Sequence, residues 1–174
     1  RAVYENVEMA DVLEALLGLD VRKTIQSPAA NGLGEPQGAA DGKITSEYLY
    51  PRWEAFLRPN DILVGETGTA SMGLGFARMP PGSLFFNQTL WGSIGWATPA
   101  AFGAALAAPH RRVVLVTGEG SHQLTAQEIC QFSRFGLKPV IFCLNNDGYL
   151  IERLLCKYPD LAYNDVARWN YAQL

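Results

Sequence analysis

The sequence predicts an α/β fold, in which a mostly parallel sheet has helices on both faces. Residues 113–116 and 139–144 are continuous apolar runs, as expected for parallel strands that are covered on both sides. Between them, residues 124–135 have the apolar spacing of a helix, which ends at Gly136. A strand, a helix and a strand in this order form one βαβ unit, the building block of such folds.

The elements before and after this unit can be assigned in order. Thr45 is suited to cap a helix that runs toward Arg58, and Pro51 is expected to kink or shorten that helix. The further expected elements are a short strand at 61–64, a turn at 65–69, a strand around Phe85 and Phe86, a Gly-framed turn at 91–95, a helix at 97–108, a tight turn at 118–121, a loop at 145–149 and a helix from Ile151.

The N-terminal part of the chain has a different pattern. Residues 7–17 place five apolar side chains on one helical face, whereas residues 26–43 are rich in Gly, Pro and Ala and have no apolar period. We therefore expect residues 1–25 to be the tail of a preceding middle domain, residues 26–43 a linker, and residues 44–174 the domain itself. Since the chain begins at Arg1 without a leader, we expect an internal piece of a longer protein.

Composition argues against several classes of protein. The net charge is −3, without long runs of one sign, which argues against a nucleic-acid partner because phosphate binding needs a basic face. No stretch of about 18 apolar residues is present, so no membrane span is expected. Cys130, Cys143 and Cys156 form no C-x-x-C pair, and we expect reduced thiols, the first two in the core, in a cytoplasmic protein.

Two loops combine oxygen donors with glycines. Glu119 and Asn146 each follow a predicted parallel strand, at the carboxyl edge of the sheet, where such folds bind ligands. A carboxylate, an amide and backbone carbonyls are hard oxygen donors, which suit Mg²⁺ or Ca²⁺ better than Zn²⁺ or Cu²⁺. Ser121 offers a hydroxyl, and the glycines allow backbone N–H groups to approach a phosphate. The two loops therefore indicate a metal–diphosphate site.

These residues also resemble a known family. Gly118-Glu119-Gly120, followed by Asn145-Asn146, resembles the thiamine-diphosphate fingerprint Gly-Asp-Gly…Asn-Asn. Six further blocks in the same order resemble the pyruvate and indolepyruvate decarboxylases: GETGTAS (65–71), LWGSIG (90–95), QLTAQEI (123–129), LKPVIF (137–142), NNDGYLIE (145–152) and YNDVARWNY (163–171). The resemblance covers residues 43–174 and implies a truncated thiamine-diphosphate-binding fold.

The resemblance implies how thiamine diphosphate and Mg²⁺ would be held. Glu119, Asn146 and the carbonyl of Gly148 resemble the family's metal ligands. The implied cofactor contacts are Thr67, Gly68, Thr69, Gly92, Ser93, Ile94, Gly120, Ser121, Asn146, Tyr149 and Ile151. Among these, Gly92 resembles the carbonyl that receives the amine of the aminopyrimidine, and Ile94 resembles the apolar wedge that bends the cofactor. Glu152 resembles the catalytic acid.

The implied activity is the non-oxidative decarboxylation of a 2-oxo acid to an aldehyde and CO₂. Pyruvate, indolepyruvate and phenylpyruvate are the candidate substrates, and Ala70, Ser71 and Leu155 are expected to line part of their pocket. The family takes an activating glutamate from the pyrimidine-binding domain of a partner subunit. We therefore expect the parent protein to be a homo-oligomer and the 174-residue chain alone to be inactive.

One departure from the family pattern affects the metal site. Glu119 stands where the family has Asp, and the extra methylene moves the carboxylate by about 1.5 Å. Because Mg²⁺ requires near-ideal octahedral geometry, we expect weaker or more calcium-tolerant metal binding. Two other functions stay open at this point: a carboligase of the acetolactate-synthase type, and a non-catalytic relative with a structural or regulatory role.

Simpler interpretations exist for several of these residues. Ile94 could be an ordinary core residue, and Glu152 could be a solvated acid at a helix N-terminus. Adjacent Ser121 and His122 point apart and have no third partner, which argues against a nucleophile–base pair. A dinucleotide-binding fingerprint starting at Gly118 fails, because its last glycine is replaced by Gln123.

Overall fold

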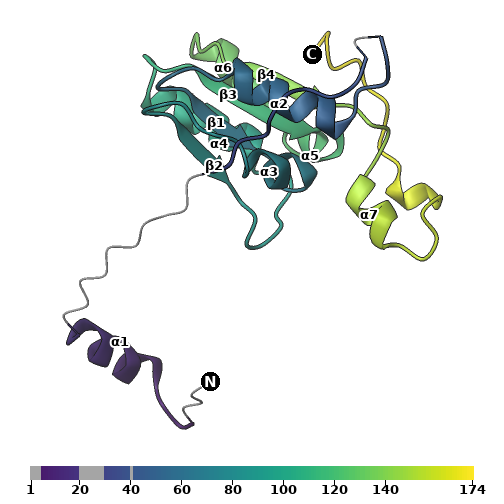
Figure 1. Ribbon diagram of the computed structural model, residues 1–174. Coiled ribbons are helices and arrows are strands. Elements are labelled where there is room, and N and C mark those ends of the chain that lie inside the picture. The colour runs from purple at the N-terminus through teal and green to yellow at the C-terminus, as the bar shows by residue number, and fades with distance from the viewer. Residues whose placement is uncertain (1–4, 20–29, 40) are drawn as a thin grey trace.

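The computed structural model describes residues 5–19, 30–39 and 41–174. Its centre is a four-stranded sheet in the order β2-β1-β3-β4 (Figure 1). The strands are β1 (Ile62–Gly65), β2 (Leu84–Asn87), β3 (Val113–Gly118) and β4 (Val140–Leu144), and every pairing between them is parallel. The predicted α/β class with a parallel sheet is therefore confirmed.

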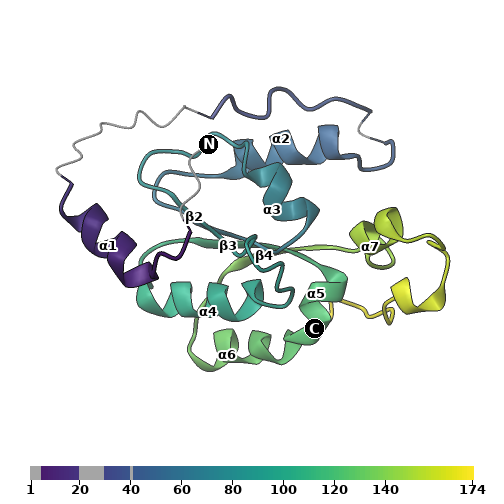
Figure 2. The same cartoon turned by 90° about the horizontal axis from the view of Figure 1, so that it is seen from below.

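One face of the sheet is covered by α2 (Ser46–Phe56) and α3 (Thr69–Leu74) (Figure 2). Leu63, Val114 and Val116 point to this side and pack with Trp53 and Leu74 in a buried cluster. Burial of such side chains stabilises the fold by roughly 1.5–3 kcal/mol each. This face therefore fixes the two helices that precede and follow β1.

The opposite face is covered by α4 (Ala97–Ala107) and α6 (Ile129–Arg134) (Figure 2). The alternate residues of the same strands, Ile62, Val64 and Leu115, pack here against small residues such as Ala101 and against Phe132. Strands with apolar residues toward both faces appear in the sequence as unbroken apolar runs, which explains the pattern at residues 113–116.

The helix predicted at 124–135 is wrong in its extent. A helix begins at Glu119 instead, inside the predicted turn at 118–121, and the segment is divided into α5 (Glu119–Leu124), a 3₁₀ turn (Ala126–Glu128) and α6. Thr125 interrupts the helix because its hydroxyl donates to the carbonyl of Gly95 at 2.8 Å, a contact with a distant loop. The predicted turn at 65–69 likewise leads directly into α3, a helix that the sequence pattern did not predict.

Pro51 was expected to kink or shorten its helix, and the helix continues past it to Phe56. It lies inside α2 and is buried. A proline lacks the N–H that would bond to the carbonyl four residues earlier. That carbonyl, of Glu47, accepts the N–H of Gln37 at 3.0 Å instead. The predicted linker, of which residues 30–39 and 41–43 are described, is thus bonded to α2 through Gln37.

Two helices lie outside the covered sheet. α1 (Met9–Leu17) has no buried residue, and Figure 1 shows it apart from the sheet. α7 (Leu150–Leu155) follows β4 and precedes a 3₁₀ turn (Ala162–Asn164). The helices predicted at 7–17 and from Ile151 are confirmed. The remainder of the predicted tail and linker, residues 1–4, 20–29 and 40, lies outside the described residues, and the domain boundaries stay a prediction.

Other expectations meet the structure with mixed results. Cys130 is exposed, so its predicted place in the core is wrong. Cys143 is half-buried, and this burial, together with the charge of Glu119, raises the pKa of its thiol to about 11. In the described ranges, no helix has both the length and the apolar character that a membrane span requires.

Candidate cofactor and metal site

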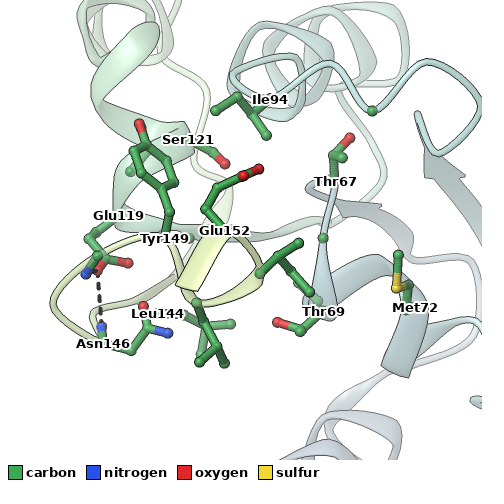
Figure 3. Close-up of a pocket in the computed structure, with 18 of the residues that line it drawn as sticks. Thr67, Thr69, Met72, Ile94, Glu119, Ser121, Leu144, Asn146, Tyr149 and Glu152 are labelled. Atoms are coloured by element: carbon green, nitrogen blue, oxygen red, sulfur yellow. Dashed lines mark hydrogen bonds between the residues drawn. The ribbon is translucent and has the colours of Figure 1, made fainter. Parts of the chain in front are cut away.

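A cavity of about 570 Å³ lies at the carboxyl edge of the sheet (Figure 3). The chain enters the sheet at β1, adds β2 on one side, and crosses to β3 on the other, so the strand order reverses between β1 and β3. Ligands of open α/β sheets bind outside the strand ends at such a reversal. The cavity occupies this position, because residues following β1 and β3 line it.

Most of the sequence-predicted site residues meet in this cavity. Those that line it are Thr67, Gly68, Thr69, Gly92, Ile94, Glu119, Gly120, Ser121, Asn146, Gly148, Tyr149, Ile151 and Glu152. Ser93 does not line it; its backbone carbonyl accepts the hydroxyl of Thr67 at 3.2 Å. Residues separated by up to 85 positions in the sequence are thus brought to one place by the parallel sheet.

The loop after β1 and the loop after β2 are bonded to each other. Gly68 has a φ of 113°, a conformation that favours glycine, and it precedes the first turn of α3. Thr67 donates its hydroxyl to the carbonyl of Gln88 at 2.6 Å. Ile94 is 39% exposed and lines the cavity, so it is not an ordinary core residue.

Oxygen donors converge at the tips of β3 and β4. Glu119 is 2% exposed, and its Oε1 accepts the N–H groups of Asn146 at 3.2 Å and Gly148 at 2.8 Å. The Asn146 side-chain oxygen lies 3.1 Å from Oε1 and 3.0 Å from Oε2 of Glu119, and 3.2 Å from the carbonyl oxygen of Gly148. Figure 3 shows the two side chains facing each other.

Oxygen atoms at these distances repel one another unless something positive lies between them. Turning the amide of Asn146 by 180° would replace the contacts by hydrogen bonds to Glu119 and Gly148. A cation would stabilise them as they stand. Neighbouring ligands of an octahedral Mg²⁺ are about 3.0 Å apart, given bonds of about 2.1 Å. The donor set from Glu119, Asn146 and Gly148 therefore fits Mg²⁺.

The charge of the cavity leads to the same conclusion. Among the described residues, its lining contains two carboxylates, of Glu119 and Glu152, and no Lys, Arg or His. A diphosphate could not bind against these charges without a cation to neutralise it. In the described part of the chain, no three His, Cys, Asp or Glu side chains form a cluster that could hold a metal. A cation here would thus rely on one carboxylate and neutral oxygens, the set that Mg²⁺ accepts together with phosphate and water.

Two glycines are required by close packing in this region. A Cβ at Gly120 would lie 2.5 Å from the ring of Tyr149, so the ring packs directly on the start of α5. Gly148 has a φ of 134°, and a Cβ there would lie 2.6 Å from both Arg153 and the carbonyl of Asn164. These contacts hold the loop after β4 against α5 on one side and against the C-terminal segment on the other.

The helix α7 forms one side of the cavity and has no buried residue. Glu152 lies on its first turn, and Figure 3 shows its carboxylate directed toward Ser121 and Ile94. Of the residues expected to line a substrate pocket, Ala70 does so, whereas Ser71 is buried and Leu155 is 79% exposed; neither of these two lines the cavity.

The lining also includes residues that the sequence pattern did not indicate, namely Met72, Thr89, Gly118, Leu144 and Leu150. Met72 could have been found from the helical spacing that starts at Thr69, if α3 had been recognised. Thr89 and Leu144 carry no local signal. They are placed by the ends of β2 and β4, which only the sheet pairing brings together.

His122 does not face Ser121. It is 2% exposed, and its Nδ1 lies 3.2 Å from the hydroxyl of Thr98 on α4. Burial lowers the pKa of this imidazole below its ordinary value of 6.5. His122 is therefore a packed interior residue, and a Ser–His nucleophile pair is not formed.

Comparisons with known proteins give a consistent family. The model of a family described as "Thiamine pyrophosphate enzyme, C-terminal TPP binding domain" matches residues 58–168. A putative pyruvate decarboxylase of Schizosaccharomyces pombe is 41% identical over 184 residues, covering 99% of this chain and 32% of the relative. An alpha-keto-acid decarboxylase of Mycobacterium leprae is 42% identical over 176 residues, covering 99% of this chain and 31% of the relative.

The chain thus spans about a third of the length of these relatives. Among solved structures, a thiamine diphosphate-dependent 4-hydroxybenzoylformate decarboxylase of Rhodococcus jostii RHA1 matches with a TM-score of 0.68. The match covers 80% of this chain and 28% of that protein, at 23% sequence identity. At this identity the likeness concerns the fold, and it agrees with the sheet described above.

Proposed function

The chain belongs to the thiamine pyrophosphate enzymes, as a C-terminal TPP-binding domain, and we propose that it serves a thiamine-diphosphate- and Mg²⁺-dependent decarboxylase of 2-oxo acids. The observation that carries the proposal is the meeting of Glu119 with the loop of Asn146 and Gly148 in a cavity whose lining, among the described residues, has no cationic side chain. The names of the relatives support the decarboxylase class.

In this proposal, one end of the cavity holds the diphosphate and the metal. Glu119, Asn146 and the carbonyl of Gly148 are the protein ligands of Mg²⁺. The hydroxyls of Ser121 and Thr69 and the backbone at Ile151, all in the cavity lining, donate to phosphate oxygens. Because α5 has only six residues, its contribution comes from individual N–H and O–H donors.

The loop after β2 holds the aminopyrimidine end of the cofactor. The carbonyl of Gly92 would receive the exocyclic amine, and Ile94 would pack against the rings; Gly68, Gly120 and Tyr149 would complete the contacts. Ser93 would act indirectly, because its carbonyl accepts the hydroxyl of Thr67. The thiazolium of the bound cofactor supplies a nucleophile and an electron sink. The protein orients it, excludes water and controls protons.

Glu152 is the proposed acid on the open side of the cavity. It is exposed in this chain, and a carboxyl group donates a proton near neutral pH only where water is excluded. An additional cover is supported by large apolar side chains that are exposed on three segments that contribute to the cavity, namely α3, the loop after β2 and α7: Met72 (58%), Leu90 (84%), Trp91 (80%), Leu154 (71%) and Leu155 (79%).

We propose that this cover is the pyrimidine-binding domain of a partner subunit in a homo-oligomer. Exposed large apolar side chains on neighbouring segments are typical of a surface that binds a partner. We also propose a cytoplasmic location, which is supported by free thiols at Cys130, Cys143 and Cys156.

The test of the proposed activity uses the full-length protein that contains this chain. With thiamine diphosphate and Mg²⁺, we expect it to convert pyruvate, phenylpyruvate or indolepyruvate to the corresponding aldehyde and CO₂, measured by product analysis. Acetolactate as the product from pyruvate would favour the carboligase. Failure to bind the cofactor in calorimetry would favour a non-catalytic relative.

A second test concerns the metal. Glu119 is longer by one methylene than the family's Asp, and we propose that it binds Mg²⁺ more weakly and tolerates Ca²⁺ better. Titration of the full-length protein and of its Glu119→Asp variant with each metal, in the presence of cofactor, measures the preference. Equal affinities of the two proteins for Mg²⁺ would contradict this proposal.

A further inference from the structure

Glu66 is a buried carboxylate to which the proposed function assigns no role. It is 0% exposed and does not line the cavity. Its Oε1 accepts the N–H of Thr67 at 2.9 Å, and its Oε2 accepts the N–H of Ala97 at 3.2 Å. Burial raises the pKa of this carboxyl group. Hydrogen bonds from backbone N–H groups and from the hydroxyl of Thr117 act in the opposite direction and lower it, but burial has the larger effect.

The two N–H groups belong to different parts of the cavity. Thr67 begins the loop after β1, whereas Ala97 begins α4 and ends the loop that carries Gly92 and Ile94. Glu66 thus joins the end of β1 to the far end of the loop after β2. The hydroxyl of Thr67 makes a parallel connection, by donating to the carbonyl of Gln88 at the near end of the same loop.

We infer that Glu66 is a positioning residue, which sets the spacing between the loop of Gly92 and Ile94 and the rest of the cavity so that both ends of one cofactor bind at once. The inference rests on the proposed function. A two-ended ligand gains affinity when both of its halves bind without moving the protein, and loses that gain when one half is displaced.

A carboxylate is the side chain that this position requires. Each of its two oxygens faces a separate N–H donor, so both must accept. Glutamine has nearly the same shape, but its NH₂ group would face one of these donors and leave it without an acceptor. Aspartate keeps the charge, but it is shorter by about 1.5 Å and cannot reach both loops.

The diphosphate end of the cavity has its own support. Glu119 joins α5 to the loop after β4 through the N–H groups of Asn146 and Gly148, with no contact to Glu66. Loss of Glu66 should therefore disturb the aminopyrimidine end and leave the diphosphate end in place. Inorganic pyrophosphate with Mg²⁺ probes the second end alone, and thiamine diphosphate with Mg²⁺ probes both.

The experiment measures the binding of both ligands by calorimetry in the full-length protein and in its Glu66→Gln variant. We expect thiamine diphosphate to bind at least about tenfold more weakly to the variant, and pyrophosphate to bind within about threefold of wild type. Glu66→Asp is a second variant with the same expected selectivity, in case the first does not fold.

Glu54→Gln is the matched control. The Oε2 of Glu54 also accepts two backbone N–H groups, of Leu33 at 2.9 Å and Arg78 at 2.7 Å, but Glu54 lies outside the cavity lining. We expect this variant to bind both ligands like wild type. The control therefore separates loss of a bonded carboxylate in general from loss of the one beside the cofactor loops.

Two results in the Glu66 variants would overturn the inference: unchanged thiamine diphosphate affinity, or equal weakening of thiamine diphosphate and pyrophosphate, which would mean general damage. Both results require a wild-type protein that binds thiamine diphosphate. A wild-type protein that binds none would overturn the proposed function together with the inference, so the two failures are distinguishable.

Discussion

Three polar side chains that closely follow β1 and β3 are buried, whereas α7, on another side of the cavity, has no buried residue. Glu66, Glu119 and Ser121 are 0%, 2% and 7% exposed, while α7 contains no buried residue. The side of β1 and β3 is packed between two layers of helices, and α7 extends beyond the sheet (Figure 2).

The α7 side is held by fewer and more exposed contacts. Its main buried anchor is Asn164, whose backbone carbonyl accepts the N–H of Tyr149 at 3.0 Å. The ion pairs Arg153–Asp165 and Arg168–Asp147 add to it, but both are at least partly open to water. The proposed metal and diphosphate end is therefore supported by bonds within this chain, whereas the end at Glu152 has fewer and more exposed contacts.

The largest effect is expected when the charge of Glu119 is removed. Glu119→Gln keeps the shape of the side chain but removes its charge. A neutral amide would then face the N–H groups of Asn146 and Gly148 and the metal. We expect Mg²⁺-dependent binding of thiamine diphosphate to weaken at least about a hundredfold, measured by calorimetry. Glu128→Gln, outside the cavity lining, should bind normally, and normal binding by the Glu119 variant would contradict the assigned site.

The second prediction tests the packing between the two sides. A methyl group at Gly120 would lie 2.5 Å from the ring of Tyr149, so Gly120→Ala should destabilise the protein by about 1–3 kcal/mol in denaturant unfolding. Gly118→Ala is the control, because its Cβ would meet nothing within 4 Å. Adding Tyr149→Ala should remove the clash in the Gly120 variant, so the double variant should be more stable than the sum of the two single effects predicts. Simple additivity of the two effects would argue against this contact.

The third prediction concerns how the free energy of unfolding depends on pH through a buried histidine. Burial lowers the pKa of His122 below 6.5 in the folded chain. As the pH falls, the unfolded chain therefore takes up a proton at His122 before the folded chain does. The contribution to stability is complete above pH 6.5 and is lost as the pH falls through the folded pKa. We expect the slope of unfolding free energy against pH to reach up to about 1.4 kcal/mol per unit in that window.

His122→Gln should remove this part of the slope, and His110→Gln, at an exposed histidine, should leave it unchanged. Denaturant unfolding between pH 7 and 5 measures both variants. Identical slopes in the two variants would mean that His122 is not the responsible group.

The smallest effect is expected on the α7 side. Arg168 is 83% exposed and pairs with Asp147 at 3.2 Å, so Arg168→Ala should change the free energy of unfolding by no more than roughly 0.5 kcal/mol. Arg153, which is 28% exposed and pairs with Asp165 at 2.6 Å, should matter more when replaced by Ala. The reverse order in thermal unfolding would show that the segment after α7 is held differently.

The prediction from sequence succeeded where local pattern and spacing carry the information. The apolar runs at 113–116 and 139–144 identified two strands, and the polar residues behind them identified Glu119 and Asn146, because parallel strands end at a common edge. It failed at residues 124–135, where a bond from Thr125 to the distant carbonyl of Gly95 interrupts a pattern that is locally helical.

The amino-acid sequence was sufficient to predict the α/β class, the family and most of the residues that line the cavity. Apolar periodicity and loop composition are local properties of the chain, so they can be read without the fold. The folded structure was needed to show that Glu66 joins two loops, that Tyr149 packs on Gly120, and that Glu119 bonds to the loop of Asn146 and Gly148. Such contacts arise between residues up to 31 positions apart, and they depend on strand pairing and register, which no local pattern encodes.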